Sequence, residues 1–120
     1  MKIERDFFYD PNLVLFLPLY KLDGAIIKDE SAYGRLCTVT GALWTPRGRD
    51  FDGTDDYVRV AYDADINTNE MSAFTLSLWA SRDDTTDAAI MSQFGAGTYQ
   101  GWMIWRQSGT TQYKFYVNGT

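Results

Sequence analysis

The residues best suited to chemistry are four aspartates in one short segment, Asp50, Asp52, Asp55 and Asp56. Calcium takes about six to eight oxygen ligands from carboxylates and carbonyls. Gly53 would let the backbone fold tightly around an ion. Asp52, Asp55 and Asp56 are therefore a candidate calcium site. Turn chemistry explains the same residues, because aspartate and glycine favour turns through local side-chain hydrogen bonds, and it is the interpretation we favour.

The chain lacks the side chains that most often carry out catalysis. The sequence has no histidine and one cysteine, which excludes Ser-His-Asp and Cys-His nucleophiles and zinc held by histidine or by several thiolates. A glycosidase needs two carboxyl groups facing each other across the scissile bond. The three glutamates, Glu4, Glu30 and Glu70, are far apart, and nearly all aspartates lie in turn-like segments. We therefore expect no enzymatic activity and no catalytic residues.

Aromatic side chains are the candidate binding surface, since they make up 16% of the chain. Flat rings stack on apolar faces of a ligand, while polar neighbours bind its hydroxyl groups. Trp79 would share a strand face with Thr75 and Ser77, which suits a sugar or a protein surface. Burial of Trp79 in a core is the other interpretation, and the one that we favour for so large a ring. The further candidate ligand contacts are Trp105, Tyr57 and Arg59.

Short alternating segments must position these residues. Period-2 alternation of apolar and polar residues predicts β-strands, and strands separated by turn residues every 8–12 positions or so predict a sandwich or barrel. An Asp52-Gly53 turn predicts a hairpin between residues 49–51 and 57–60. Trp102 and Trp105 differ in parity, so one should be buried and the other outward. Only residues 63–72 suggest a helical turn. The expected strands are residues 12–20, 35–39, 57–60, 74–81, 88–94, 101–106 and 113–117.

Five blocks in order, Ala42-Leu43-Trp44, Phe51 to Val58, Phe74 to Trp79, Gly101-Trp102 and Phe115 to Gly119, resemble the laminin-G-like branch of the concanavalin A-like lectin/glucanase superfamily. The resemblance implies an all-β, antiparallel two-sheet jelly-roll sandwich. It implies a non-catalytic module that binds carbohydrate or a surface protein, with calcium as a frequent ligand. The alternative that the resemblance allows is a structural or assembly domain of a viral or phage particle or fibre. The Glu-x-Asp-x-x-Glu motif of the superfamily's glucanases is absent, so a hydrolase remnant is the least favoured reading.

The charge and hydropathy of the chain limit which classes of partner and which cellular compartments fit it. The net charge of −5 and the scattered basic residues argue against nucleic acid, whose phosphates need a basic stripe. No segment approaches the roughly 20 apolar residues of a membrane span. The N-terminus lacks the pattern of a signal peptide, and a virion-associated or extracellular context fits the family. We expect Cys37 to be a buried, inert thiol.

Residues 1–12 read as an N-terminal extension and residues 13–120 as a partial laminin-G-like domain. The family pattern normally continues beyond Asn118-Gly119, where a turn into another strand is expected. An incomplete sandwich leaves strand edges unpaired and open to association, so a homo-oligomer is one expectation, and assembly with another chain or a smaller self-contained β fold are the alternatives.

Overall fold

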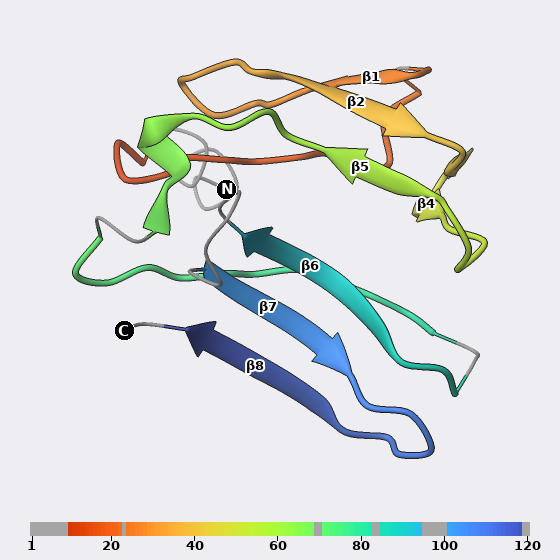
Figure 1. Cartoon of the computed structure of the whole chain (residues 1–120). Helices are drawn as coiled ribbons and strands as arrows, with labels where there is room; N and C mark the ends of the chain where they lie inside the picture. Colours follow the sequence, from red (N-terminus) through yellow and green to blue (C-terminus); the bar gives the residue numbers. More distant parts are fainter. Residues whose placement is uncertain (1–9, 23, 69–70, 83–84, 95–100, 119–120) are drawn as a thin grey trace, which may run out of the picture. The chain divides into compact units, whose positions relative to one another are not determined.

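The chain is all-β in the computed structural model, which describes residues 10–22, 24–68, 71–82, 85–94 and 101–118 (Figure 1). The described strands form three antiparallel sheets, and a short 3₁₀ turn, η1 (Ala64–Ile66), lies in the segment that suggested a helical turn. The chain divides into an N-terminal unit, Met1–Ile66, and a C-terminal unit, Asn67–Thr120. Among the described residues, none lies in a helix of the length and apolarity that a membrane crossing requires.

The main sheet of the N-terminal unit has the order β1-β2-β5, from β1 (Ile26–Lys28), β2 (Leu36–Thr40) and β5 (Tyr57–Arg59). Ile27 pairs with Cys37, and Val39 pairs with Val58. Because side chains alternate between the two faces of a strand, these four residues share one face of the sheet, the inner face. Ile27 and Cys37 are fully buried. Burial raises the pKa of the Cys37 thiol, and the nearby carboxylate of Asp29 raises it further. The expected buried thiol is therefore confirmed.

A two-residue turn, Pro46-Arg47, joins β3 (Leu43–Thr45) to β4 (Gly48–Asp50). The Thr45 hydroxyl fixes this turn, since it accepts from the Arg47 N–H and donates to the Gly48 carbonyl. The predicted hairpin across Asp52-Gly53 is wrong, because β4 pairs with β3 while β5 pairs with β2. Six residues separate β4 from β5, which is too long for the tight turn that an Asp-Gly pair makes.

The C-terminal unit contains the longest strands, β6 (Ala88–Phe94), β7 (Gly101–Arg106) and β8 (Tyr113–Asn118), in the order β6-β7-β8. All three lie where the alternation predicted them. One face carries Trp102, which is 5% exposed, and Phe115, both of which contact the Phe74 ring. Gln93 supports Trp102, because its Oε1 accepts from the indole N–H at 3.0 Å and from the Thr68 hydroxyl at 2.8 Å.

Two expected strands are absent from the described ladders. Residues 13–17 are extended without strand pairing, and the backbone of Phe16 instead bonds the Asp29 carboxylate and the Glu30 N–H. Residues 74–81 also lie outside any ladder. Phe74 and Leu76 are nevertheless less exposed than Thr75 and Ser77, so part of the predicted alternation survives as packing. Alternation reports which side chains are buried, but not whether the backbone finds a hydrogen-bonding neighbour.

Candidate functional site

The segment of residues 51–56, called the acidic loop below, brings three carboxylates together. Asp52, Asp55 and Asp56 each place an oxygen within 4.8 Å of the other two. Asp52 Oδ1 accepts from the N–H groups of Thr54 and Asp55, and Asp56 Oδ2 accepts from the Asp52 N–H at 2.9 Å. These bonds are the turn chemistry that we favoured for Asp52. Asp50 lies on β4, outside this group.

Gly41 fixes where the acidic loop lies. Its φ of 74° is in the left-handed region, and a Cβ built there would stand 1.6 Å from Asp56 Oδ1. Only glycine meets both demands, because it lacks a Cβ and adopts positive φ without strain. The end of β2 therefore holds the loop through direct backbone contact with a carboxylate.

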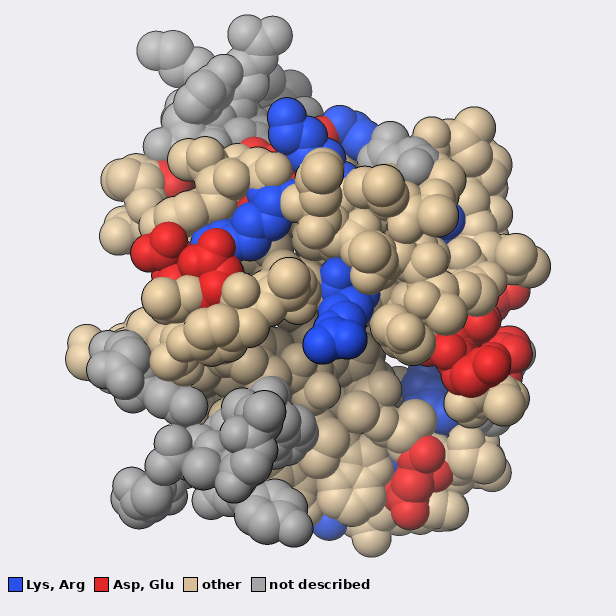
Figure 2. Space-filling view, turned by 45° about the horizontal axis from the view of Figure 1, so that its top comes forward, with Lys and Arg blue, Asp and Glu red and all other residues tan. Residues whose placement is uncertain are grey.

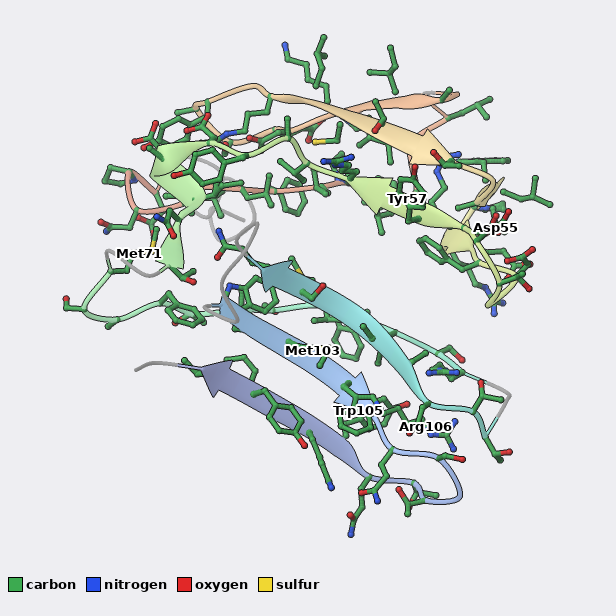
Figure 3. The ribbon with its side chains drawn as sticks, in the orientation of Figure 1. Asp55, Tyr57, Met71, Met103, Trp105 and Arg106 are labelled. Atoms are coloured by element: carbon green, nitrogen blue, oxygen red, sulfur yellow. The ribbon has the colours of Figure 1, made fainter. Side chains whose placement is uncertain are left out.

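The predicted contacts Tyr57 and Arg59 lie on one face of β5, next to the acidic loop (Figure 3). We call this side of the β1-β2-β5 sheet the outer face. Tyr57 is 48% exposed and Arg59 is also exposed. The register places seven side chains on it, namely Ile26, Lys28, Leu36, Thr38, Thr40, Tyr57 and Arg59. The face is thus mixed apolar, hydroxyl and basic, and it holds no acidic residue.

Trp79 is fully exposed, with a relative accessibility of 101%. The interpretation of Trp79 as a core residue, which we favoured, is therefore wrong in this structure. Its segment forms no ladder with the described strands, so none of them pairs beside the indole. Both ring faces are open to solvent, which is unusual for the largest apolar side chain.

Trp105 lies on the opposite face of β7 from the buried Trp102, as their parity predicted. Tyr116 stacks on Trp105 with ring centroids 5.6 Å apart, and the Lys114 ammonium lies 5.8 Å from the Trp105 centroid. Tyr116 therefore extends the aromatic patch of Trp105. Tyr113 pairs with Arg106 on the other face and is not part of this patch. Figure 3 shows Trp105 and Met103 on β7.

A buried polar network in the N-terminal unit was missed by the sequence reasoning. Asp29 is fully buried, and its carboxylate accepts from the N–H groups of Phe16 and Ser31 and from the Ser31 hydroxyl. Arg35 donates to Asp29 Oδ2 at 3.1 Å and to Asp63 Oδ2 at 2.9 Å. The available signal was Asp29-Glu30-Ser31, since aspartate often accepts from the backbone two residues on.

The charges of this network are stabilised by their partners. Burial alone would raise the pKa of Asp29, but its backbone and side-chain hydrogen bonds outweigh burial and lower the pKa. The hydrogen bond from Arg35, followed by that from the Asp65 N–H, lowers the pKa of Asp63. Arg35 also donates to the Val14 carbonyl at 2.6 Å and lies over the Tyr33 ring. The network is structural, because its buried carboxylate is saturated with donors.

The five predicted contacts and metal ligands of the N-terminal unit therefore lie on and beside β5, whereas Trp79 and Trp105 belong to the C-terminal unit. Searches of family models, of curated proteins and of solved structures returned no match for this chain. The fold and its exposed groups define an all-β protein made of antiparallel sheets.

Proposed function

We propose that this protein is a non-catalytic recognition module that binds carbohydrate on a laminin-G-like, concanavalin A-like sandwich. The support for the fold is the all-β chain and the order of motifs along it. The support for a non-catalytic role is chemical, since histidine is absent and the three glutamates are scattered. Both the laminin-G-like sandwich and the carbohydrate ligand are part of what we propose.

The observation that carries the proposal is the exposed indole of Trp79. Leaving a large ring in water forgoes the free energy of burial, about 25 cal/mol per Å² of apolar surface. A ligand that covers the ring recovers this energy, which is why tryptophan is enriched among the residues that dominate binding. Thr75 and Ser77, both exposed on the same extended segment, add hydroxyl groups of the kind that bind a sugar.

A glycan array followed by titration of intrinsic fluorescence tests this proposal. The Trp79→Ala variant should weaken binding to an array-positive glycan at least tenfold, because the ring is the contact. Trp79→Phe should keep part of the affinity, and Tyr62→Ala, which removes another exposed ring, should keep all of it. Since Trp79 is exposed, circular dichroism should show unchanged folding. Equal affinity of the wild type and Trp79→Ala would refute the role of this ring, and an array without a positive glycan would refute the carbohydrate ligand.

A second candidate is an assembly domain of a viral or phage particle or fibre, and the outer face favours it. Ile26, Leu36 and Tyr57 are 50%, 66% and 48% exposed on one short sheet. Exposed apolar side chains gathered on one face mark surfaces for association with other proteins. Assembly that depends on protein concentration, without any response to sugar, would support this candidate over the first.

We propose calcium as the ligand of the acidic loop in the recognition module. Three carboxylates are close enough to share one ion, although Asp52 Oδ1 and Asp56 Oδ2 already accept backbone N–H groups. Carbonyls or water would complete the shell. An ion that binds only the folded chain at 100 times its Kd stabilises it by about 2.7 kcal/mol. Calcium should therefore raise the Tm of the wild type, and EDTA should reverse the increase. The Asp55→Asn variant should show no increase. A wild-type Tm that does not change with calcium would exclude the site.

A further inference from the structure

The outer face of the β1-β2-β5 sheet has a charge opposite to that of the chain. The whole protein has a net charge of −5, with 16 acidic and 11 basic residues. The strands of the outer face carry two basic residues, Lys28 and Arg59, and no acidic one, while Glu30, which lines a hollow with Ile26 and Lys28, is paired with Lys21. Figure 2 shows acidic side chains in several clusters, some of them beside basic side chains, on a surface that is mostly neither. A face of one sign favours a partner surface of the other sign.

The two cations are available to a partner. Within the described part of the chain, neither Lys28 nor Arg59 takes part in an ion pair, whereas Lys21 pairs with Glu30, and Arg35 pairs with Asp29. Lys28 and Arg59 lie on the two edge strands of this sheet, two strand spacings across and two residues along, which places their Cα atoms about 12 Å apart. Ile26 and Leu36 lie exposed on the same face, so the face combines charge with apolar area.

The acidic loop offers the complementary chemistry. Asp52 and Asp55 are exposed, and Phe51 beside them is 43% exposed. The loop therefore presents carboxylates with an apolar ring, as the outer face presents cations with aliphatic side chains. The aliphatic side chains favour a protein partner over a sugar, because they bind no hydroxyl group and gain only by burial.

We propose that the acidic loop of one copy binds the outer face of another copy. This inference rests on the assembly role given above as the second candidate. Because the acidic loop lies next to the outer face, two copies can make the contact reciprocally in a two-fold dimer or repeat it head-to-tail. The outer face has seven residues, whereas a stable interface uses about 20–30 on each side. The association should accordingly be weak, with a Kd of tens to hundreds of micromolar, as befits small transient contacts.

Analytical ultracentrifugation of the 120-residue chain across this concentration range tests the inference. The wild type should associate, and raising the salt from about 0.1 M to 1 M, which shortens the Debye length from about 10 Å to 3 Å, should weaken the contact. The variant K28E/R59E should associate at least tenfold more weakly. The control R47E/K114E makes the same change in net charge at exposed or half-exposed positions that are not on the strands of the outer face, and it should associate as the wild type does.

Charge reversal on both partners completes the test. D55K alone should also weaken association, and a mixture of K28E/R59E with D55K should form hetero-oligomers that neither variant forms alone. Asp55 suits this purpose because its carboxylate accepts no hydrogen bond among those of the described loop, so the turn should persist. A chain that stays monomeric throughout would overturn both the inference and the assembly role. Association that K28E/R59E leaves unchanged would overturn the inference alone.

Discussion

Removal of the buried charge of Asp29 by Asp29→Asn should destabilise the N-terminal unit. The amide oxygen can still accept from the N–H groups of Phe16 and Ser31, but the amide nitrogen then faces the Arg35 guanidinium, donor against donor. Breaking a buried ion pair by removing one partner costs about 3–5 kcal/mol. Arg35 keeps a second carboxylate partner. We therefore expect the lower end of this range, about 3 kcal/mol.

Native-state hydrogen exchange measures this loss in the unit concerned. The Val39 amide, which donates to the Ala25 carbonyl at 2.8 Å, should lose about 100-fold in protection, since each 1.4 kcal/mol or so is tenfold. Asp50→Asn, the same change at an exposed position, should leave the Val39 amide protected as before. A change of less than about threefold for Asp29→Asn would contradict the reasoning.

The same carboxylate predicts how the stability depends on pH. The folded-state pKa of Asp29 is lowered from 3.8, so its contribution is complete above the pKa of the unfolded chain. The contribution is lost as the pH falls through the lower, folded-state value. The difference in unfolding free energy between wild type and Asp29→Asn should thus stay constant above about pH 5 and shrink below about pH 4. A difference that grows on acidification would reverse the assigned sign.

Three further substitutions or reactions test the packing. Gly24→Ala, with open space around it, should lower the free energy of unfolding by the about 1–2 kcal/mol that a left-handed alanine costs. Gly41→Ala should lower it by more, because its Cβ also overlaps a carboxylate of the acidic loop. Equal losses for the two variants in urea unfolding would refute the close approach at Gly41. Trp102→Ala should cost about 3–5 kcal/mol and Trp79→Ala less than about 0.5 kcal/mol, and the reverse order would reject the burial assigned to each. Cys37, buried and with a raised pKa, should react with iodoacetamide only after unfolding, and rapid native alkylation would show it accessible.

Local patterns in the sequence predicted the C-terminal sheet well. Strands β6, β7 and β8 are flanked by polar or glycine-containing segments, and the parity of Trp102 and Trp105 separates buried from outward side chains, as expected. The partner of a strand was harder to predict. The sequence indicated that β5 exists, but its pairing with β2 depends on contacts between segments distant in the chain. Hydrophobic pattern alone carries no such information.

The candidate site was also predictable only in the parts that depend on residues close together in the sequence. The acidic loop was predictable because aspartate and glycine act within a few residues of each other. The Asp29 network was not, because Arg35 and Asp63 are 28 residues apart, and charged residues are seldom fully buried. The exposure of Trp79 could not be predicted either, since a ring of this size is expected to be buried.

The irregularity in β6 decides which of its side chains meet the neighbouring strand. Pairing shifts between Ala89 and Met91, so Ile90 is an extra residue in the strand. Strict alternation through Ile90 would turn Gln93 away from the side on which Trp102 lies. Because the bulge leaves Ile90 without a pairing partner, Gln93 stays on that side and its amide reaches the indole. Deleting Ile90 would therefore give a regular strand in which the residues that follow keep their present sides. Sequences that share this sheet should be aligned with a one-residue gap allowed at that position.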